Sequence, residues 1–298
     1  MKVLICDPTD PEALKTIEEA GIEVVDRPSI TPEELEEAIP EFECMVVRSR
    51  TKVRENVIDK ADNLKAIVRA GVGLDNIDVE YAESKGIEVL NTPSASTQAV
   101  AELTIGYLFA LARRIPQMTA SMRAGEWAKK SFLGTEIAGK TLGLIGAGRI
   151  GSAVGCCATA LGMTVLSRDP YVDKCEGAEL TNMDDLLTRS DYISLHVPHN
   201  ESTHNIIDAE AIEKMKQGVY IINCGRGGTL DEDALYEAIK AGKVAGAALD
   251  VYAEEPSKGH KLYTLDEVIG SPHVGAGTVE AKKRVGEVAA QKVIGALT

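Results

Sequence analysis

The sequence predicts an α/β protein with two doubly wound parallel sheets and an interdomain cleft. Short apolar runs alternate with polar, helix-forming segments in two successive arrays, which is typical of parallel sheets with helices on their faces. A glycine-rich turn also joins an apolar run to a helix-forming segment in the second array. A chain of 298 residues is long enough for two such domains.

The first array carries clear helix boundaries. Thr31-Pro32-Glu33-Glu34 is a capping box with proline at the first helical position, and Gly21 and Gly86 stop helices. The predicted strands of this array are residues 3–6, 22–25, 44–47, 65–68 and 87–90.

The second array begins after a long apolar helix over about 98–113. Its strands are expected near residues 141, 163, 192, 219, 245 and 268. The pattern of 279–297 is helical and can return to the first array. We therefore expect a discontinuous, flavodoxin-like domain of residues 1–94 plus 276–298 and a Rossmann domain of residues 95–275.

The glycine-rich turn has the form of a dinucleotide site. Gly146 permits a tight turn, Gly148 lets the backbone approach a pyrophosphate, and Gly151 lets helix and strand pack closely. The pyrophosphate would lie at a helix N-terminus, where free N–H groups favour anions. Asp169 follows the next predicted strand, where its carboxylate can accept hydrogen bonds from the adenosine ribose. These features predict NAD or a close relative as the cofactor.

Asp169 favours NAD over NADP, because its carboxylate repels a 2′-phosphate. Arg168 beside it can bind the same phosphate, so the strictness of this preference stays open. A second glycine motif, 134–141, matches the phosphate loop of nucleotide hydrolases. Its context excludes that function, because a strand rather than a helix follows Lys140.

Composition excludes several other functions. The net charge of −14 argues against nucleic-acid and anionic-membrane surfaces. Residues 1–10 do not form a signal peptide, and no apolar run approaches the length of a membrane span, so we expect a soluble, cytoplasmic protein.

The cysteines and histidines predict no metal site. The six cysteines have no CxxC spacing, which indicates a reducing compartment, and neighbouring Cys156 and Cys157 are expected to fill the core. His196, His199 and His204 cluster without a nearby set of acidic or cysteine partners.

Three predicted strand ends carry an arginine, an acid and a histidine that suit hydride transfer. Arg226 can bind a carboxylate through two parallel hydrogen bonds, and His273 can exchange a hydroxyl proton. Glu255 can orient the imidazole and stabilise its cation. Each residue alone is better explained as a surface charge, a loop histidine or a solvated acid. Together, on one edge of a dinucleotide-binding sheet, they favour a catalytic role.

With these residues the chain resembles the D-isomer-specific 2-hydroxyacid dehydrogenases, and most closely those members that oxidise D-3-phosphoglycerate. The resemblance covers nearly the whole length. It is carried by Val47-Arg48-Ser49, Arg69 to Asn76, Asn91-Thr92-Pro93, Ala101-Glu102-Leu103, Trp127 to Gly151 and the three strand ends.

The resemblance implies a role for each matching residue. Arg226, Glu255 and His273 would be catalytic. The cofactor would contact Val72, Gly146, Gly148, Arg149, Ile150, Gly151, Asp169, Val197, Pro198, Cys224, Gly225, Arg226, Asp250, His273, Gly275 and Ala276. The substrate would contact Arg48, Ser49, Gly71, Val72, Gly73, Asn91, Lys129, Arg226 and His273.

The family further implies that the second domain binds NAD and the first binds substrate. An arm around Trp127 would cross to a partner subunit, giving a homodimer or a tetramer. The chain, which ends at Thr298, would be a short form without the regulatory extension of longer relatives. Lys129 stands where related enzymes often have arginine.

The expected reaction is NAD-dependent oxidation of D-3-phosphoglycerate to 3-phosphohydroxypyruvate, which opens serine synthesis. In an acidic protein such a substrate needs local cations, and the candidates are Arg48, Arg50, Arg69, Lys129 and Lys130. The alternative within the family is a glyoxylate or hydroxypyruvate reductase, or another D-2-hydroxyacid dehydrogenase. The alternative outside enzymes is an NAD-sensing, corepressor-like binding protein.

Overall fold

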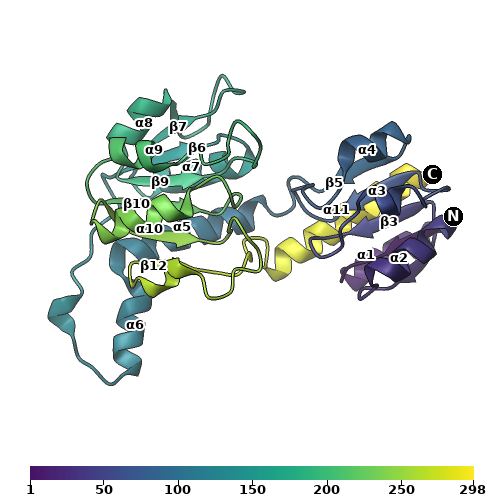
Figure 1. Ribbon diagram of the computed structural model, residues 1–298, viewed down its shortest axis with the longest axis horizontal. Helices are drawn as coiled ribbons and strands as arrows, with labels where there is room; N and C mark the ends of the chain where they lie inside the picture. Colours follow the sequence, from purple (N-terminus) through teal and green to yellow (C-terminus); the bar gives the residue numbers. More distant parts are fainter. The chain divides into compact units, whose positions relative to one another are not determined.

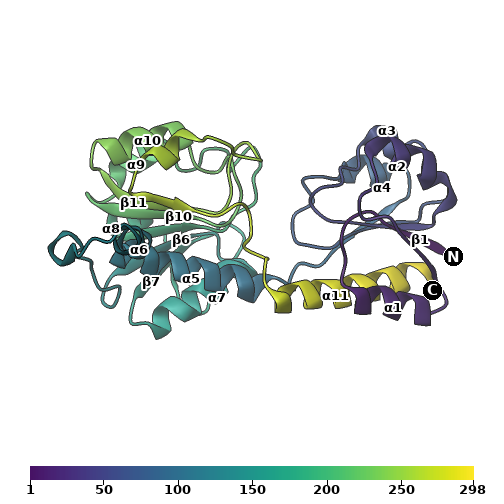
Figure 2. The same cartoon turned by 90° about the horizontal axis from the view of Figure 1, so that it is seen from below.

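A computed structural model describes residues 1–298 and divides into two compact units. Unit 1 is Met1–Thr97 with Ala276–Thr298, and unit 2 is Gln98–Gly275. Each unit is a parallel sheet with helices on both faces (Figures 1 and 2). The prediction of an α/β protein with two doubly wound parallel sheets is confirmed.

Unit 1 contains a five-stranded sheet in the order β2-β1-β3-β4-β5, the order of flavodoxin-like folds. Its strands are β1 (Lys2–Ile5), β2 (Glu23–Asp26), β3 (Cys44–Val47), β4 (Ala66–Arg69) and β5 (Glu88–Asn91). Its helices are α1 (Pro11–Glu19), α2 (Pro32–Ala38), α3 (Glu55–Ile58), α4 (Val79–Ser84) and α11 (Val279–Leu297).

Alternation along the strands builds the two cores of this unit. Val3 and Ile5 face α1 and α11, whereas Leu4 faces the side covered by α2, α3 and α4. The C-terminal helix α11 (yellow in Figure 1) lies along α1 (purple), and the two helices cover the same face of the sheet. The capping box at Thr31 and Glu34 forms as predicted.

Unit 2 contains a seven-stranded sheet in the order β12-β11-β10-β9-β6-β7-β8. Its strands are β6 (Thr141–Ile145), β7 (Thr164–Arg168), β8 (Glu179–Leu180), β9 (Tyr192–Leu195), β10 (Val219–Asn223), β11 (Val244–Leu249) and β12 (Val268–Gly270). Its helices are α5 (Thr97–Arg113), α6 (Ile115–Arg123), α7 (Arg149–Ala160), α8 (Met183–Arg189), α9 (Ala209–Lys214) and α10 (Glu232–Lys240). The strand order reverses between β6 and β9, as in Rossmann sheets, and ligands of such sheets bind at this reversal.

Three features of unit 2 differ from the sequence prediction. The short strand β8 and the helix α6 were not predicted, because β8 is too short to show an alternating pattern and α6 buries no residue. Cys156 is exposed and Cys157 is half-buried, so the prediction that both fill the core is wrong. The buried face of α7 instead carries Val154 and Ala158.

The turn between β6 and α7 requires glycine at two positions, because a side chain there would overlap neighbouring backbone atoms. Gly146 has φ 101°, and a Cβ there would lie 2.6 Å from the carbonyl oxygen of His196. A Cβ on Gly151 would lie 2.1 Å from the carbonyl oxygen of Gly146. A Cβ on Gly148, at the helix N-cap, would meet no atom within 4 Å. Two of the glycines therefore fit helix against strand, and the third leaves open space over the backbone.

His196 follows β9 and packs beside this turn. Its Nε2 lies 2.9 Å from Ser194 Oγ, and its buried Nδ1 has no hydrogen-bond partner. Burial lowers the pKa of His196 from 6.5 to about 4, so the ring is neutral at physiological pH.

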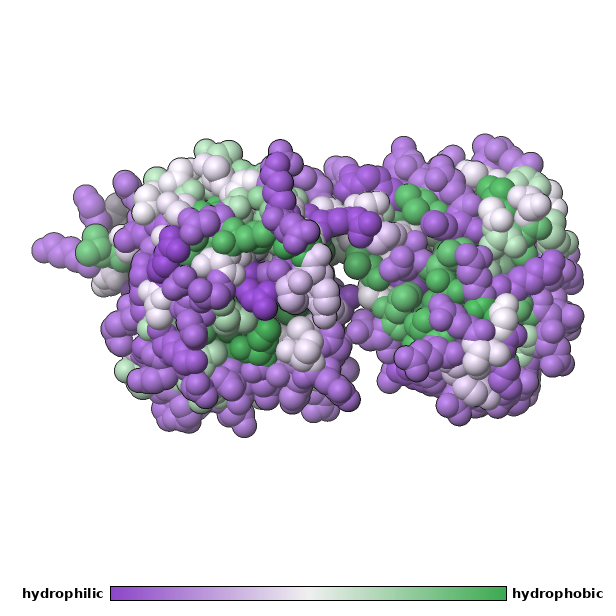
Figure 3. All heavy atoms as spheres, turned by 90° about the horizontal axis from the view of Figure 1, so that it is seen from above, coloured by the Kyte–Doolittle hydropathy of each residue, from purple (hydrophilic) through white to green (hydrophobic).

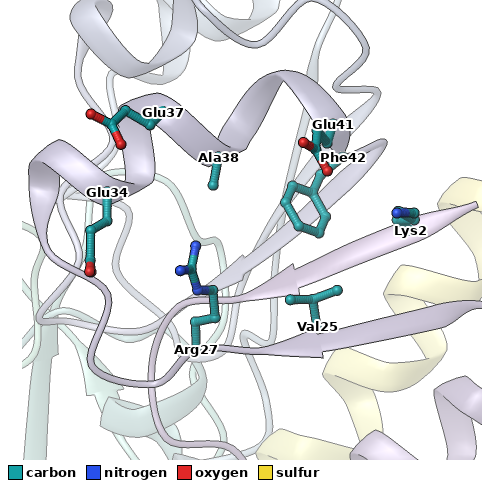
Figure 4. A pocket seen from close by; sticks show the side chains of 8 residues that line it. All are labelled: Lys2, Val25, Arg27, Glu34, Glu37, Ala38, Glu41 and Phe42. Carbon is teal, nitrogen blue, oxygen red and sulfur yellow. The ribbon is translucent and has the colours of Figure 1, made fainter.

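The surface of the molecule is mainly hydrophilic on the face shown in Figure 3, with hydrophobic areas on both units. A pocket of about 420 Å³ lies between the edge of the first sheet and α2 (Figure 4). Its lining residues are Lys2, Val25, Arg27, Glu34, Glu37, Ala38, Glu41 and Phe42, and none of them belongs to the predicted site. No helix in the structure combines the length and the apolar character needed to cross a bilayer.

The glycine turn predicts unequal effects of two alanine substitutions. Gly151→Ala should lower the free energy of unfolding by about 1 to 3 kcal/mol, because the new methyl group overlaps a carbonyl oxygen. Gly148→Ala should cost less than about 1 kcal/mol, the usual difference at an N-cap. Urea unfolding of the wild type and both variants measures this, and equal losses would contradict the packing described for Gly151.

The buried imidazole predicts a pH dependence of stability. Between pH 6.5 and about 4 the unfolded chain binds a proton at residue 196 and the folded chain does not. Stability is therefore lost as pH falls through this window, by about 3 kcal/mol from this group. His196→Gln should remove that part of the slope. If urea midpoints of wild type and variant fall in parallel from pH 7 to 4, the ring is not buried as described.

Candidate active site

The acid after β7 lies against the glycine turn. Asp169 Oδ2 accepts the N–H of Ala147 at 2.8 Å, and Oδ1 accepts the N–H of Tyr171 at 2.9 Å. The carboxylate is therefore fixed beside the N-terminus of α7, where the open backbone at Gly148 leaves room for a phosphate. This cradle fits a dinucleotide. Arg149 and Ile150 form the first helical residues, and Arg168 is the last residue of β7.

Other predicted cofactor residues lie at neighbouring strand ends. A Cβ on Gly146 would lie 3.0 Å from Val197 Cγ1, and Pro198 follows directly. A Cβ on Gly225 would lie 2.9 Å from the carbonyl oxygen of Leu195, so the loop after β10 packs against the end of β9. Burial raises the pKa of the Cys224 thiol to about 12, which keeps it protonated.

A buried carboxylate holds the turn that carries His273. Asp250 follows β11 and is 1% exposed. Its Oδ1 accepts the N–H of Val274 and its Oδ2 accepts the N–H of Gly275, both at 2.7 Å. Its main-chain oxygen accepts the N–H of His273 at 2.8 Å. The turn places His273 in the left-handed region, with φ 53°.

The histidine is paired with the predicted acid. His273 Nδ1 lies 2.7 Å from Glu255 Oε2, and Glu255 Oε1 accepts the N–H of Tyr252 at 3.1 Å. Because an ionised carboxylate only accepts hydrogen bonds, Nδ1 carries the proton. Nε2 is then the atom left to take a proton from a ligand. The side chain of His273 is 48% exposed, so solutes can reach it.

Arg226 lies on the loop after β10. Its Nη1 donates to the carbonyl oxygen of Gly225 at 2.8 Å, and its own carbonyl oxygen accepts from Thr229 Oγ1 at 2.7 Å. A Cβ on Gly227 would lie 1.7 Å from the carbonyl oxygen of Tyr252. The arginine loop therefore packs against the loop that carries Glu255, and only glycine fits at the contact.

Sequence reasoning missed the residues behind this edge. Ser271 Oγ donates to Asp250 Oδ1, and Tyr107 OH lies 2.5 Å from Ser271 Oγ. Burial raises the pKa of Tyr107 to about 12. The hydroxyl of Tyr252 lies 3.0 Å from the carbonyl oxygen of Leu249 and 2.9 Å from that of Ser271, and its single hydrogen can be donated to either. The position of Ser271 directly after a strand was the one available signal.

In unit 1 a second buried aspartate organises the predicted substrate loop. Asp7 follows β1, and its Oδ2 accepts the N–H of Arg48 at 2.6 Å. Arg50 donates to Asp7 Oδ1 at 2.9 Å and to the carbonyl oxygens of Ile30 and Pro28 at 3.0 Å. The guanidinium of Arg50 thus supports the loops themselves. Arg48 is half-buried, and the neighbouring Ser49 is exposed.

The loop after β4 lies at the same edge of the first sheet. A Cβ on Gly71 would overlap the guanidinium of Arg69, which lies over the loop. Asn91 Nδ2 donates to the carbonyl oxygen of Val72 at 2.7 Å, which holds the segment through Gly73 against the end of β5. Asn76 Nδ2 donates to the carbonyl oxygen of Arg48 at 2.7 Å and ties the two loops together.

The remaining candidates lie elsewhere. Lys129 and Lys130 are exposed on a 3-10 turn after α6. His199 Nε2 lies 3.1 Å from His204 Nδ1. No group of three or more histidine, cysteine, aspartate or glutamate side chains is arranged to hold a metal ion.

Comparison with known proteins places the chain in a family. Residues 105–275 match the model of the D-isomer specific 2-hydroxyacid dehydrogenase NAD binding domain. The chain is 51% identical to D-3-phosphoglycerate dehydrogenase of Methanocaldococcus jannaschii, over 98% of this chain and 57% of that protein. It is 47% identical to hydroxypyruvate reductase of Thermotoga maritima, over 98% of this chain and 97% of that protein.

A solved structure agrees with these matches. The TT0316 protein of Thermus thermophilus superposes with a TM-score of 0.92 at 35% identity, covering 100% of this chain and 97% of that chain. The glycine cradle, the paired histidine and the matches over most of the chain lead to one conclusion. The chain belongs to the D-isomer-specific 2-hydroxyacid dehydrogenases, and its second unit contains their NAD-binding domain.

Proposed function

We propose that this chain oxidises D-3-phosphoglycerate to 3-phosphohydroxypyruvate with NAD. The observation that carries the catalytic part is the 2.7 Å contact between His273 and Glu255, on a turn fixed by the buried Asp250. The substrate is supported by relatives such as the Methanocaldococcus jannaschii protein, although the chain spans only 57% of that protein's length. The product is a precursor for serine synthesis.

The residues divide the reaction between them. NAD, when bound, supplies the acceptor for the hydride that leaves C2 of the substrate. Nε2 of His273 takes the proton of the C2 hydroxyl as the carbonyl forms, and Glu255 stabilises the resulting imidazolium through Nδ1. Arg226 binds the substrate carboxylate through parallel N–H groups and favours charge on the neighbouring oxygen. The proton and the hydride together balance the oxidation of an alcohol to a ketone.

The proposed cofactor contacts are centred on the glycine turn and Asp169. We propose that the backbone from Gly146 to Gly151 binds the pyrophosphate and that Asp169 accepts the ribose hydroxyl groups. Asp250 would contact the nicotinamide end of the cofactor. The remaining cofactor contacts inferred from the family are Val72, Arg149, Ile150, Val197, Pro198, Cys224, Gly225, Gly275 and Ala276.

We propose that unit 1 binds the anionic groups of the substrate. Arg48 follows β3, and its guanidinium, whose Nη1 donates to the carbonyl oxygen of Pro8 at 3.3 Å, would bind an anionic group, as would the backbone of the loop from Gly71 to Gly73. The hydrogen bond from Asn91 Nδ2 to the carbonyl oxygen of Val72 keeps that loop in place. Local cations are needed because the chain carries a net charge of −14. Lys129 would supply a further charge.

A second candidate is hydroxypyruvate reductase. One observation favours it: the Thermotoga maritima enzyme is matched over 97% of its own length, so the two chains have similar extent. Such an enzyme would gain little from the cations proposed for the phosphate. A corepressor-like role is disfavoured by the pairing of His273 with Glu255, which NAD sensing does not need.

We also propose a cytoplasmic homodimer formed through the arm after α6. Trp127 is 82% exposed and Leu133 is 91% exposed, and large apolar side chains so open to water are suited to burial against a second subunit. A tetramer built from such dimers is compatible with the same arm.

The substrate proposal predicts a selective effect of Arg48→Ala. Charged hydrogen bonds to phosphate contribute about 1.5 to 3 kcal/mol each, so KM for D-3-phosphoglycerate should rise about 10- to 100-fold. KM for D-glycerate should change much less, because that substrate has no phosphate. Initial rates of NAD reduction with D-3-phosphoglycerate, D-glycerate and D-lactate measure both.

Lys52→Ala is the matched control, since Lys52 is an exposed cation on the same loop. It should leave KM for all three substrates unchanged. Equal losses on phosphorylated and unphosphorylated substrates in Arg48→Ala, or a wild-type preference for D-glycerate, would transfer the assignment to the hydroxypyruvate reductase candidate.

A further inference from the structure

The structure contains a second glutamate–histidine pair, Glu232 with His260. His260 Nε2 is 2.9 Å from Glu232 Oε2, and the two side chains are only 21% and 14% exposed. Glu232 is the first residue of α10, and His260 lies on the loop between β11 and β12 that also carries Glu255. The proposed catalytic steps do not use this pair.

The proton of His260 can be placed from its contacts. The N–H of Leu262 donates to His260 Nδ1 at 3.3 Å, so Nδ1 is an acceptor and carries no proton. Nε2 therefore bears the hydrogen and donates it to the Glu232 carboxylate. Both ring nitrogens of His260 are used within the protein, which leaves none for a ligand.

The two pairs meet at one peptide segment, Tyr252–Ala253. The N–H of Tyr252 donates to Glu255 Oε1 at 3.1 Å, and the next N–H, of Ala253, donates to Glu232 Oε1 at 2.8 Å. The carbonyl oxygen of Tyr252 packs against Gly227 on the loop that carries Arg226, at the position that a Cβ of residue 227 would occupy. This segment therefore contacts Glu255 directly, His273 through Glu255, and the loop that carries Arg226 through Gly227.

We propose that Glu232 and His260 are positioning residues for hydride transfer. Glu232 holds Ala253, His260 holds Glu232, and the fixed segment sets Glu255 against His273 and supports the loop of Arg226. The inference rests on the proposed roles of that trio and adds residues from α10 and from the far end of the loop. It requires no contact between either residue and the substrate.

A displaced base lowers the rate of chemistry without weakening cofactor binding. Glu232→Ala removes both acceptor oxygens and should lower kcat about 10- to 100-fold, the range expected when a reacting group is misplaced by about 1 Å. The Kd for NAD should stay at the wild-type value, because the glycine cradle is untouched. Glu237→Ala is the matched control: it lies on the same helix, and its carboxylate pairs only loosely with Lys240, at 3.9 Å.

Two substitutions of His260 separate its two contacts. His260→Gln keeps a donor toward Glu232 and should retain most of kcat. His260→Asn keeps an acceptor for the N–H of Leu262 but loses the contact with Glu232, and it should resemble Glu232→Ala. The midpoint of thermal unfolding is measured for each variant, and these two keep the proposal testable if Glu232→Ala fails to fold.

A double-mutant cycle with Glu255→Gln decides whether the pair acts through Glu255. The substrate is whichever D-2-hydroxy acid the wild type oxidises fastest. We expect Glu232→Ala to cost much less in the Glu255→Gln background than alone. Additive losses, or a kcat for Glu232→Ala equal to that of Glu237→Ala, would overturn the inference. A wild-type kcat in Glu255→Gln itself would instead overturn the proposed role of Glu255.

Discussion

The hydrogen bonds accepted by the buried carboxylate of Asp250 are the interaction on which the catalytic edge depends. A carboxylate in a site that excludes water must have its oxygens paired, and Asp250 meets that requirement with the N–H groups of Val274 and Gly275 and the hydroxyl of Ser271. Satisfying Asp250 therefore fixes the turn. This fixed turn holds His273 in a left-handed backbone conformation that a free loop would rarely adopt.

The same device occurs in unit 1. Asp7 is 1% exposed after β1, and it accepts N–H groups from Arg48 and Thr51 on the loop after β3. Since β1 pairs with both β2 and β3, this loop lies where the strand order reverses. In unit 2 the glycine turn after β6 lies at the corresponding reversal, between β6 and β9. In each sheet, therefore, one set of proposed ligand contacts lies at the reversal, the Arg48 loop in unit 1 and the glycine turn in unit 2, and most of the others follow other strands of the same sheet.

Whether a feature could be predicted from the sequence depends on how far apart in the sequence its interacting residues lie. Local signals worked well: the capping box at Thr31 and the pattern of 279–297 gave helices at the predicted places, because both depend on residues within a few positions. The sequence also predicts the structural roles of Gly146 and Gly151, because the turn of a dinucleotide-binding motif has no space for a side chain at these two positions. The pairing of Glu255 with His273 followed from placing strand ends on one edge.

Interactions between distant segments were not predictable. Arg50 looked like a substrate cation, yet carbonyl groups from two other segments bind its guanidinium, which no spacing in the sequence reveals. The contact of Glu232 with His260 spans 28 positions, and either residue alone resembles an ordinary surface group. Cys156 was misplaced because a helix of small residues gives only a weak indication of which side faces the sheet.

Amide hydrogen exchange at Val274 and Gly275 tests the central claim most directly, in the wild type and in Asp250→Asn. The account predicts that both amides are protected in the wild type, that they exchange faster in the variant, and that kcat falls in the same variant, because the turn no longer holds His273. Unchanged protection of both amides in Asp250→Asn would contradict it, since the turn would then be held by something other than the carboxylate.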